Sequence, residues 1–275
     1  LSALRNLSKI NEQTCYKLLD GTTMAVTRKE LISHLDHILQ SRKIRDYCPN
    51  GLQVEGKAEI KKLVTGVTAS QALIDAAIEK QADAILVHHG YFWKGESQPI
   101  TGMKKRRIAA LLNNDINLYG YHLPLDIHPE IGNNAQLAKL LDIEFTGGLE
   151  SGPNSVPVKG RLKTPLSGEE FSAKITQVLN RAPLTSLVRK EKIETIAWCT
   201  GGGQGYIDLA AAQGIDAYLT GEASEQTIHS SREQGIDFFA AGHHATERYG
   251  IKALGELLAE QHGFDVTFID IDNPV

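Results

Sequence analysis

The chain has 275 residues, of which 41% are hydrophobic and 23% charged, and its formal net charge is −4. This balance is ordinary for a globular protein, and a slightly acidic chain gives no electrostatic case for binding nucleic acid or an anionic membrane surface. No run of about 18 apolar residues predicts a membrane-spanning helix. The three cysteines, Cys15, Cys48 and Cys199, lie far apart without a CxxC pair, which is typical of a reduced, cytoplasmic compartment.

Residues 1–23 differ from the rest of the chain. They lack a continuous apolar segment, so they do not resemble a secretory signal. Met24 is one of only two methionines, and clear helix signals begin just after it. We interpret residues 1–23 as an upstream or non-native extension, and an ordinary N-terminal helix is the alternative.

The first half of the chain alternates between predicted helices and strands. A capping box formed by Thr27 and Glu30 predicts a helix that runs to about Ser41, and Asn50-Gly51 indicates a turn. Apolar periodicity then predicts strand, helix, strand, helix, strand and helix over residues 62–67, 70–80, 84–87, 104–114, 116–120 and 133–141. Because helical crossovers connect these strands, we expect them to be parallel.

The alternation pauses and then resumes in the second half. Residues 146–194 are less regular, with strand-like pieces at 156–162 and 184–188 around a helix that Ser167 opens, and we interpret them as a bridge. Strands are then predicted over 196–200, 216–220, 237–241 and 265–270, and helices over 206–213, 224–234 and 243–262. We therefore expect an α/β protein with parallel or mixed sheets in two similar lobes, 24–145 and 195–275, that form one interlocked unit.

An internal repeat relates the two halves. Several residue types of the first half recur 133 positions later. The recurring pairs are Gln71 and Gln204, Ile74 and Ile207, Asp75 and Asp208, Ala77 and Ala210, Asp83 and Asp216, and Ala84 and Ala217. A nearby offset of 121 relates His122 to His243 and Asp126 to Glu247. Each half therefore ends a strand with a histidine, and a carboxylate follows four residues later.

Two adjacent histidines, His88 and His89, end the buried strand predicted at 84–87. The carboxyl end of a strand is where open α/β sheets place their chemistry. Because successive strand residues point to opposite faces, the pair fits two neighbouring metal ions more easily than one. The alternative is one hydrogen-bonded histidine beside one solvated histidine.

Other segments supply three further metal-ligand candidates. A helix that begins near 243 puts His243 and Glu247 one turn apart on one face. Pro124 argues against a regular helix through this part of the first half, so we expect Asp126 to reach the site from a loop. Three imidazoles and two carboxylates suffice for two open metal sites that water completes. Without a thiolate, this ligand set suits Zn, Fe, Mn, Co or Ni.

Taken together, these motifs resemble the GTP cyclohydrolase 1 type 2 family, also called Nif-three-like proteins, and most closely its short bacterial YbgI-type members. The segments that carry the resemblance are 49–54, 64–68, 87–90, 122–126, 132–134, 220–222 and 242–247. The resemblance spans about Met24 to Val275. It implies a Nif-three-like fold, a ring-shaped homohexamer and a dinuclear site that faces the ring interior. The family's metal ligands carry over to His88, His89, Asp126, His243 and Glu247.

The resemblance implies two divalent metal ions per subunit and hydrolysis of a nucleotide or a related heterocycle. In the family-named reaction, water attacks C8 of GTP, the imidazole ring opens and formate is released. His122 and Glu222 are candidates for moving protons, His122 and His244 for orienting ligands, and His229 for contacting substrate. The alternative is a non-catalytic metal-binding ring that interacts with a protein or nucleic acid.

Two further signals are compatible with either of two interpretations. The triple glycine at 201–203 precedes a predicted helix, where it can cradle a phosphate or form a tight turn. The basic run at 104–107 can line a channel for an anionic ligand or form the solvated face of a helix.

Overall fold

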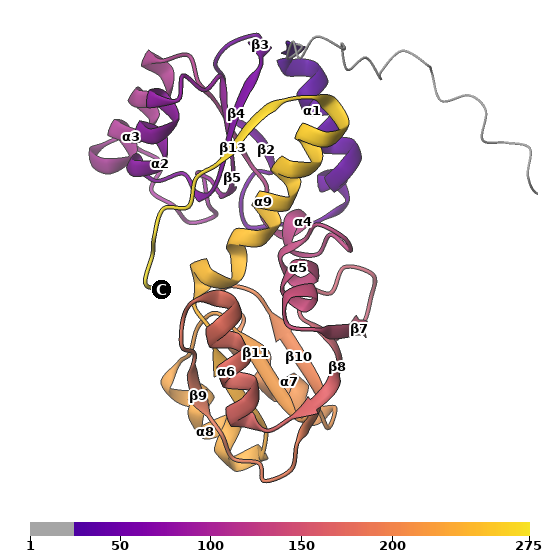
Figure 1. Ribbon diagram of the computed structural model, residues 1–275. Helices are drawn as coiled ribbons and strands as arrows, with labels where there is room; N and C mark the ends of the chain where they lie inside the picture. The colour runs from indigo at the N-terminus through magenta and orange to yellow at the C-terminus, as the bar shows by residue number, and fades with distance from the viewer. Residues whose placement is uncertain (1–24) are drawn as a thin grey trace, which may run out of the picture.

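The computed structural model describes residues 25–275 and shows two α/β lobes, one above the other in Figure 1. The long helix α9 (His243–His262) runs from the lower lobe into the upper one. The expectation for residues 1–23 lies outside the described residues. No helix within residues 25–275 combines the length and the apolar character that a bilayer crossing requires.

The first lobe contains a five-stranded sheet of order β13-β4-β5-β6-β2. Its strands are β2 (Gly51–Val54), β4 (Lys62–Thr68), β5 (Ala84–His89), β6 (Asn117–Gly120) and β13 (Asp265–Phe268). All neighbouring pairs are parallel except β2 with β6, and the short strands β1 (Val26–Thr27) and β3 (Glu59–Ile60) pair separately. The parallel strands 62–67, 84–87 and 116–120 are confirmed to within two residues.

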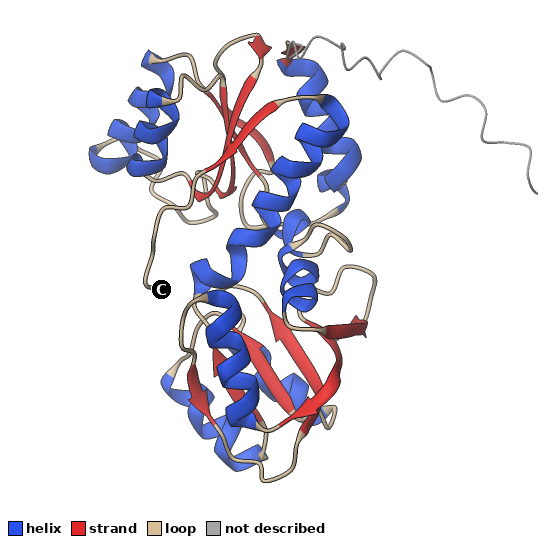
Figure 2. Cartoon of the chain, viewed as in Figure 1, coloured by secondary structure: helices blue, strands red, loops and turns tan. Residues whose placement is uncertain are grey.

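Helices cover both faces of this sheet (Figures 1 and 2). Helices α2 (Gln71–Glu79) and α3 (Gly102–Asn113) pack on one face, and α1 (Arg28–Leu39) and α9 pack on the other. The side chains of β5 alternate accordingly, because Leu86 packs with α1 and α9 whereas Ile85 and Val87 pack with α2 and α3. A strand buried on both faces needs a continuous apolar run, which explains the sequence of β5.

The second lobe contains a six-stranded sheet of order β7-β8-β10-β11-β12-β9. Its strands are β7 (Ile143–Gly148), β8 (Val158–Leu166), β9 (Leu184–Ser186), β10 (Ile193–Cys199), β11 (Ala217–Thr220) and β12 (Asp237–Ala240). Helix α6 (Gly168–Leu179) packs on one face, and α7 (Ile207–Ala212) and α8 (Glu225–Gln234) pack on the other. Segment 146–194, which we expected to bridge the lobes, supplies β8, α6 and β9, and both strands pair within this sheet.

The two lobes repeat one supersecondary unit. Strands β4, β5 and β6 are parallel, and so are β10, β11 and β12. Asp83 Oδ2 accepts hydrogen bonds from two backbone N–H groups at the start of β4, at 2.9 and 3.0 Å. Asp216, 133 positions later (216 − 83), does the same at the start of β10, at 3.1 and 2.9 Å. The repeat therefore reproduces a side-chain brace as well as the order of elements, which confirms two similar lobes.

Local sequence signals explain several helix starts but do not indicate every strand. The capping box of Thr27 and Glu30 opens α1 as predicted, and Ser167 opens α6 in the same way. The sequence did not predict β2 and β7. Strand β2 has four residues, and β7 buries only Ile143 well and ends in two glycines. Apolar and polar residues alternate only over Leu52–Val54 in β2 and Ile143–Thr146 in β7, which is at or below the shortest alternation that marks a strand.

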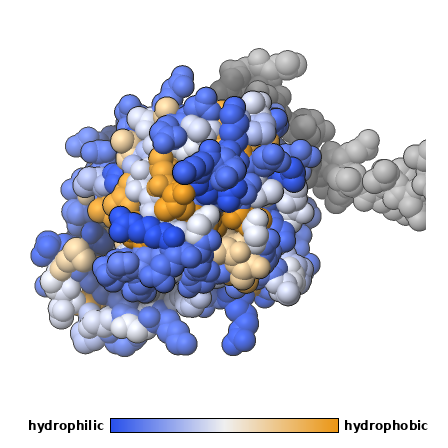
Figure 3. Space-filling view, turned by 90° about the horizontal axis from the view of Figure 1, so that it is seen from below, coloured by the Kyte–Doolittle hydropathy of each residue, from blue (hydrophilic) through white to orange (hydrophobic). Residues whose placement is uncertain are grey.

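The lower face of the second lobe is mainly hydrophilic. Viewed from below, charged and polar side chains cover most of it and interrupt the apolar areas between them (Figure 3). Phe145 and Leu184 are among the exposed apolar side chains of this lobe. Exposed apolar residues are usual on protein surfaces and do not by themselves indicate a docking face.

Candidate metal centre

Six side chains of three chain segments meet where α9 passes from one lobe to the other. The contributing residues are His88 and His89 at the end of β5, His122 and Asp126 at the two ends of the α4 turn, and His243 and Glu247 in the first two turns of α9. Helix α4 (Leu123–Asp126) corrects one expectation, because Asp126 lies in a short helix and not in a loop. Pro124 stands in the first turn of α4, where the missing N–H would have no helical partner in any case.

The two histidines of β5 are held at their Nδ1 atoms. His88 is fully buried, and its Nδ1–H donates to the backbone oxygen of Tyr121 at 3.0 Å. The Nδ1 of His89 lies 3.1 Å from the hydroxyl of Thr68 on the neighbouring strand. With Nδ1 engaged, each ring has Nε2 left to serve the centre, which is the usual arrangement of a metal-ligating histidine.

His122 and His243 are held in the same way, each by a carboxylate. The Nδ1 of His122 lies 2.8 Å from Asp46 Oδ1, and the Nδ1 of His243 lies 2.6 Å from Glu222 Oε1. A carboxylate accepts only, so both Nδ1 atoms carry the proton and both Nε2 atoms are available. All four imidazoles therefore have Nδ1 engaged, although their orienting groups come from different parts of the chain.

The Glu247 carboxylate offers one oxygen to each of two triads. Its Oε1 lies 3.5 Å from Nε2 of His88, which is also 3.4 Å from Asp126 Oδ1. Its Oε2 lies 3.1 Å from His89 Nε2 and 3.0 Å from His243 Nε2. Within each triad the possible ligand atoms lie within 4.8 Å of one another. Among the described residues, the buried Oε2 accepts no hydrogen bond of good geometry, and such an atom calls for a cation or a proton.

The electrostatics of the two buried carboxylates differ. Burial raises the pKa of Asp126, and the negative charge of Glu247 raises it further. Burial also acts to raise the pKa of Glu247, but the neighbouring imidazoles, His88 above all, outweigh it and hold this pKa well below its usual range. Two carboxylates this close need positive charge between them.

The imidazoles respond to these carboxylates. Burial alone lowers the pKa of His88, but Asp126 and Glu247 raise it to about 9. The pKa of His243 also rises to about 9, because Glu247 and Glu222 overcome its burial. Burial dominates at His89 and lowers its pKa to about 4. The cluster therefore attracts positive charge, and its nitrogen and oxygen donors fit divalent transition ions.

Two further clusters lie beside these triads, one of His88, His89 and His122 and one of Asp46, Cys48 and His122, and the second offers no further metal site. Asp46, Cys48 and His122 also bring possible ligand atoms within 4.8 Å of one another. The Asp46 carboxylate is already engaged, because it accepts hydrogen bonds from Asn50 and from the backbone N–H of Leu123 as well as from His122. Burial and the neighbouring carboxylates raise the pKa of the Cys48 thiol to about 12, so it stays protonated.

The structure separates the remaining candidate residues by their contacts. Glu222 lies behind His243, on the Nδ1 side, which favours an orienting role over a proton-transfer role. His244 Nε2 lies 2.7 Å from Asp270, and His229, on α8, pairs with Glu225 at 2.8 Å. Neither His244 nor His229 belongs to the triads within the described residues.

The triple glycine serves close packing. A Cβ on Gly201 would lie 2.0 Å from Glu247 Oε1, and a Cβ on Gly203 would lie 2.6 Å from that of Cys199. This crowding favours the tight-turn interpretation over a phosphate cradle. In the basic run at the start of α3, Lys105 and Arg106 are exposed, which fits the solvated face of a helix, whereas Lys104 pairs with Glu96 at 3.0 Å.

Sequence reasoning missed the polar residues that support the ligands. Asn133 donates to Asp126 Oδ1 at 2.8 Å, and the Thr200 hydroxyl donates to the same atom at 3.3 Å. Asp46 lies in a polar loop that resembles any other turn. Asn133 entered the sequence analysis only as part of the 132–134 motif. Two adjacent asparagines at the start of a predicted helix are the signal that could have indicated its role.

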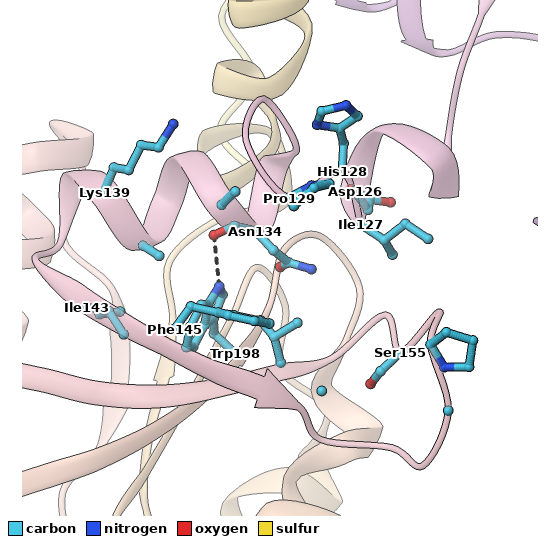
Figure 4. Close-up of a pocket in the computed structure, with 16 residues that line it drawn as sticks. Asp126, Ile127, His128, Pro129, Asn134, Lys139, Ile143, Phe145, Ser155 and Trp198 are labelled. Carbon is cyan, nitrogen blue, oxygen red and sulfur yellow. Dashed lines mark hydrogen bonds between the residues drawn. The ribbon is translucent and has the colours of Figure 1, made fainter. Parts of the chain in front are cut away.

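A pocket of about 420 Å³ lies on the other side of Asp126, between α5 (Asn133–Leu140) and the β7–β8 hairpin. Phe145 and Trp198 project into it, and the indole Nε1 of Trp198 donates to the backbone oxygen of Asn134 at 3.0 Å (Figure 4). The side chain of Asn134 is engaged with Val156 and Thr200. The pocket therefore offers a ligand mainly apolar surface.

Comparison with known proteins agrees with the motifs. A family model described as Duf34/NIF3 (NGG1p interacting factor 3) matches residues 26–274. A protein of Haemophilus influenzae named GTP cyclohydrolase 1 type 2 homolog is 68% identical over 246 residues, which cover 89% of this chain and 98% of the relative. A protein of the same name from Escherichia coli is 59% identical over 246 residues, which again cover 89% of this chain and 98% of the relative.

Solved structures show the same fold. One described as protein ybgI, of unknown function, is 57% identical with a TM-score of 0.88, and the match covers 91% of this chain and 100% of that one. Reduced HcgD of Methanocaldococcus jannaschii is 27% identical with a TM-score of 0.79, covering 92% and 100%. These matches confirm the resemblance inferred from the motifs. The chain belongs to the Duf34/NIF3 family.

Proposed function

We propose that this chain is a dinuclear metal-dependent hydrolase that acts on a nucleotide or a related heterocycle. The observation that carries the proposal is the position of Glu247, whose two oxygens face two separate triads. Two divalent ions held there supply hydroxide at neutral pH and stabilise the negative charge that develops during hydrolysis. The first ion would be held by His88, Asp126 and Glu247, and the second by His89, His243 and Glu247.

His122 is suited to move a proton. It is the one imidazole of the four that contacts neither Asp126 nor Glu247 in the described ion pairs, and its ring lies 5.1 Å from that of His88, centre to centre. Asp46 fixes its tautomer, which leaves Nε2 free to accept a proton and return it. In this role Asp46 stabilises the charged imidazole that forms.

Aromatic rings beside His122 offer a surface for a planar substrate. The ring of Trp93 stands edge-on to His122 at 4.8 Å, and the ring of Tyr47 lies 6.5 Å away and is largely exposed. The loops that carry them are joined, because Lys94 N donates to Tyr47 O at 2.7 Å. Flat heterocycles stack favourably on such rings. GTP is the first substrate to test, because the relatives are named after its cyclohydrolase reaction.

The experiment measures ions and turnover on the same preparations. The full chain is loaded with Zn, Fe, Mn, Co or Ni and assayed for formate release from GTP, and then for hydrolysis of other nucleotides. Asp126→Ala and Glu247→Ala should abolish both turnover and stoichiometric metal binding. Glu225→Ala, which removes an exposed carboxylate of α8, should change neither. Two bound ions without turnover on any nucleotide would favour the non-catalytic metal-binding alternative.

We also propose the ring-shaped homohexamer implied by the resemblance. Analytical ultracentrifugation of the full chain should give about six times the subunit mass of 30.1 kDa. A monomer at micromolar concentration would contradict this assembly.

A further inference from the structure

Asn133 connects the elements that carry the two carboxylates. It is the first residue of α5 and is fully buried. Its Nδ2 donates to Asp126 Oδ1 of α4 at 2.8 Å, and its Oδ1 accepts from the backbone N–H of Gly250 on α9 at 2.9 Å. One side chain therefore joins the Asp126 carboxylate to the helix that carries Glu247.

The orientation of the Asn133 amide follows from its partners. The Gly250 N–H group can only donate, so the amide oxygen must face α9. The amide nitrogen must then face Asp126, and it also lies 3.4 Å from His88 Nε2. Asn133 thus directs N–H groups, and no lone pair, toward the first triad. It can orient a metal ligand there but cannot be one.

The Asn133 side chain and the backbone of α9 are in close contact at Gly250. A Cβ on Gly250 would lie 2.4 Å from Asn133 Oδ1 and 2.9 Å from its Cγ. The backbone of α9 therefore rests directly on the amide. Gly250 follows Glu247 by three residues on the same helix, so the Asn133 side chain lies between Asp126 and the part of α9 that carries Glu247.

We propose that Asn133 is the positioning residue of the triad formed by His88, Asp126 and Glu247. The affinity of this triad for a divalent cation depends on Asn133, whereas His89 and His243 make no contact with Asn133 among the described hydrogen bonds and ion pairs. This inference rests on the proposed metal centre. Loss of a group that orients a ligand typically lowers metal affinity about 10–100-fold.

Two variants test the contact between Asn133 and α9, one at each of its two residues. Asn133→Ala removes the amide, and Gly250→Ala keeps Asn133 and all ligands but pushes a methyl group against the amide oxygen. Asn117→Ala is the matched control, because Asn117 is also a fully buried asparagine. Its side chain hydrogen-bonds Gly56, Lys57 and Asp83 at the opposite end of the first sheet.

The probe is Mn²⁺, titrated into the metal-free full chain, with stoichiometry from calorimetry and electron paramagnetic resonance spectra of the loaded protein. Wild type and Asn117→Ala should bind two ions with a spin-coupled spectrum. In Asn133→Ala and Gly250→Ala, the affinity of the triad of His88, Asp126 and Glu247 for Mn²⁺ should fall about 10–100-fold. These variants should then bind one ion and show the six-line spectrum of an isolated Mn²⁺. A general loss of stability does not produce this selective change, and thermal melting of all four proteins measures that loss separately.

The outcomes separate this inference from the proposed function. If the wild type binds two ions and both variants bind two with unchanged affinity, Asn133 is not the positioning residue. If the wild type binds one ion, the dinuclear proposal fails. In that case weaker binding in Asn133→Ala supports the inference. Unchanged binding overturns it, because the triad of His88, Asp126 and Glu247 then either holds no ion or does not depend on Asn133. If Asn133→Ala does not fold, Gly250→Ala decides alone.

Discussion

Gly201→Ala tests how closely the second lobe approaches the carboxylate shared by the two triads. Gly201 has φ of +68°, and a Cβ there would lie 2.0 Å from Glu247 Oε1 and 2.9 Å from His243 Nε2. Contacts of a Cβ below 3.0 Å essentially do not occur, so Glu247 must move by about 1 Å (3.0 − 2.0). A site must be held within roughly 0.5 Å of its working geometry. The added methyl group should therefore disrupt both triads.

Gly214→Ala is the control that isolates this contact. Gly214 has φ of +70° and would place its Cβ in open space. Both substitutions bear the left-handed backbone cost of about 1–2 kcal/mol in the free energy of unfolding. At roughly 2–4 °C per kcal/mol, that cost lowers the melting temperature of each metal-free variant by about 2–8 °C. Only Gly201→Ala should also weaken metal binding, by about 10-fold or more.

The assay is a Zn²⁺ titration of both variants against a chromophoric chelator, with thermal melting of the metal-free proteins beside it. Gly201→Ala should lose affinity relative to Gly214→Ala at comparable stability. Equal Zn²⁺ affinity in the two variants would refute the reasoning, because it would mean that Glu247 does not need its present position to hold an ion.

Three further predictions concern the same centre. Glu222→Ala removes the acceptor of His243 Nδ1–H and should lower Zn²⁺ affinity about 10–100-fold, as measured by chelator competition, and unchanged affinity would show that the contact does not orient the ring. With pKa values of about 9, His88 and His243 are protonated at pH 7 in the metal-free protein, so metal affinity should rise as the pH increases toward 9. Metal binding in weakly buffered solution should then release protons, and a pH-independent affinity between pH 6 and 9 would contradict this. If the ion is present at 100 times its Kd, removing it with EDTA should lower the melting temperature by about 5–10 °C per site, and adding Zn²⁺ should restore it. An unchanged melting temperature would exclude a metal that binds only the folded state.

The sequence predicted the elements whose signals are local. Two of these signals depend on neighbouring residues, namely the capping box at Thr27 and the apolar run of β5. The 133-residue repeat depends on regular spacing. The structure contains all three. The loop expected around Pro124 was wrong because a proline disrupts a helix only in the helix interior, and α4 consists of little more than a first turn. Strands β2 and β7 are short or poorly buried, so their own sequences give only a weak strand signal.

The centre was predictable where ligand chemistry follows spacing. His243 and Glu247 stand one helical turn apart, and the His88–His89 pair ends a strand, so their types and positions indicated a metal site. The groups that orient them could not be found in this way. Asp46 precedes His122 by 76 residues (122 − 46), and only the folded chain brings them to 2.8 Å. Long-range polar contacts of this kind leave no periodic signal in a single sequence.

The repeat also explains why the two lobes contribute unequally. At the offset of 133, His88 corresponds to Gly221 and His89 to Glu222. A Cβ on Gly221 would lie 2.7 Å from the Cα of His243, so this strand end must lack a side chain for α9 to enter.

The next residue, Glu222, then accepts from His243 Nδ1–H at 2.6 Å and belongs to none of the possible metal-ligand clusters of the described residues. Strand pairing gives an offset of 120 for β6 and β12, because Tyr121 N donates to Val87 O and Ala241 N donates to Thr220 O. The histidines are offset by 121, and the extra residue is Gly242, whose φ of +100° turns the chain into α9. The first copy of the unit thus supplies His88 and His89 from its strand. In the second copy a glycine stands at the position of His88, and α9 supplies His243 and Glu247 instead.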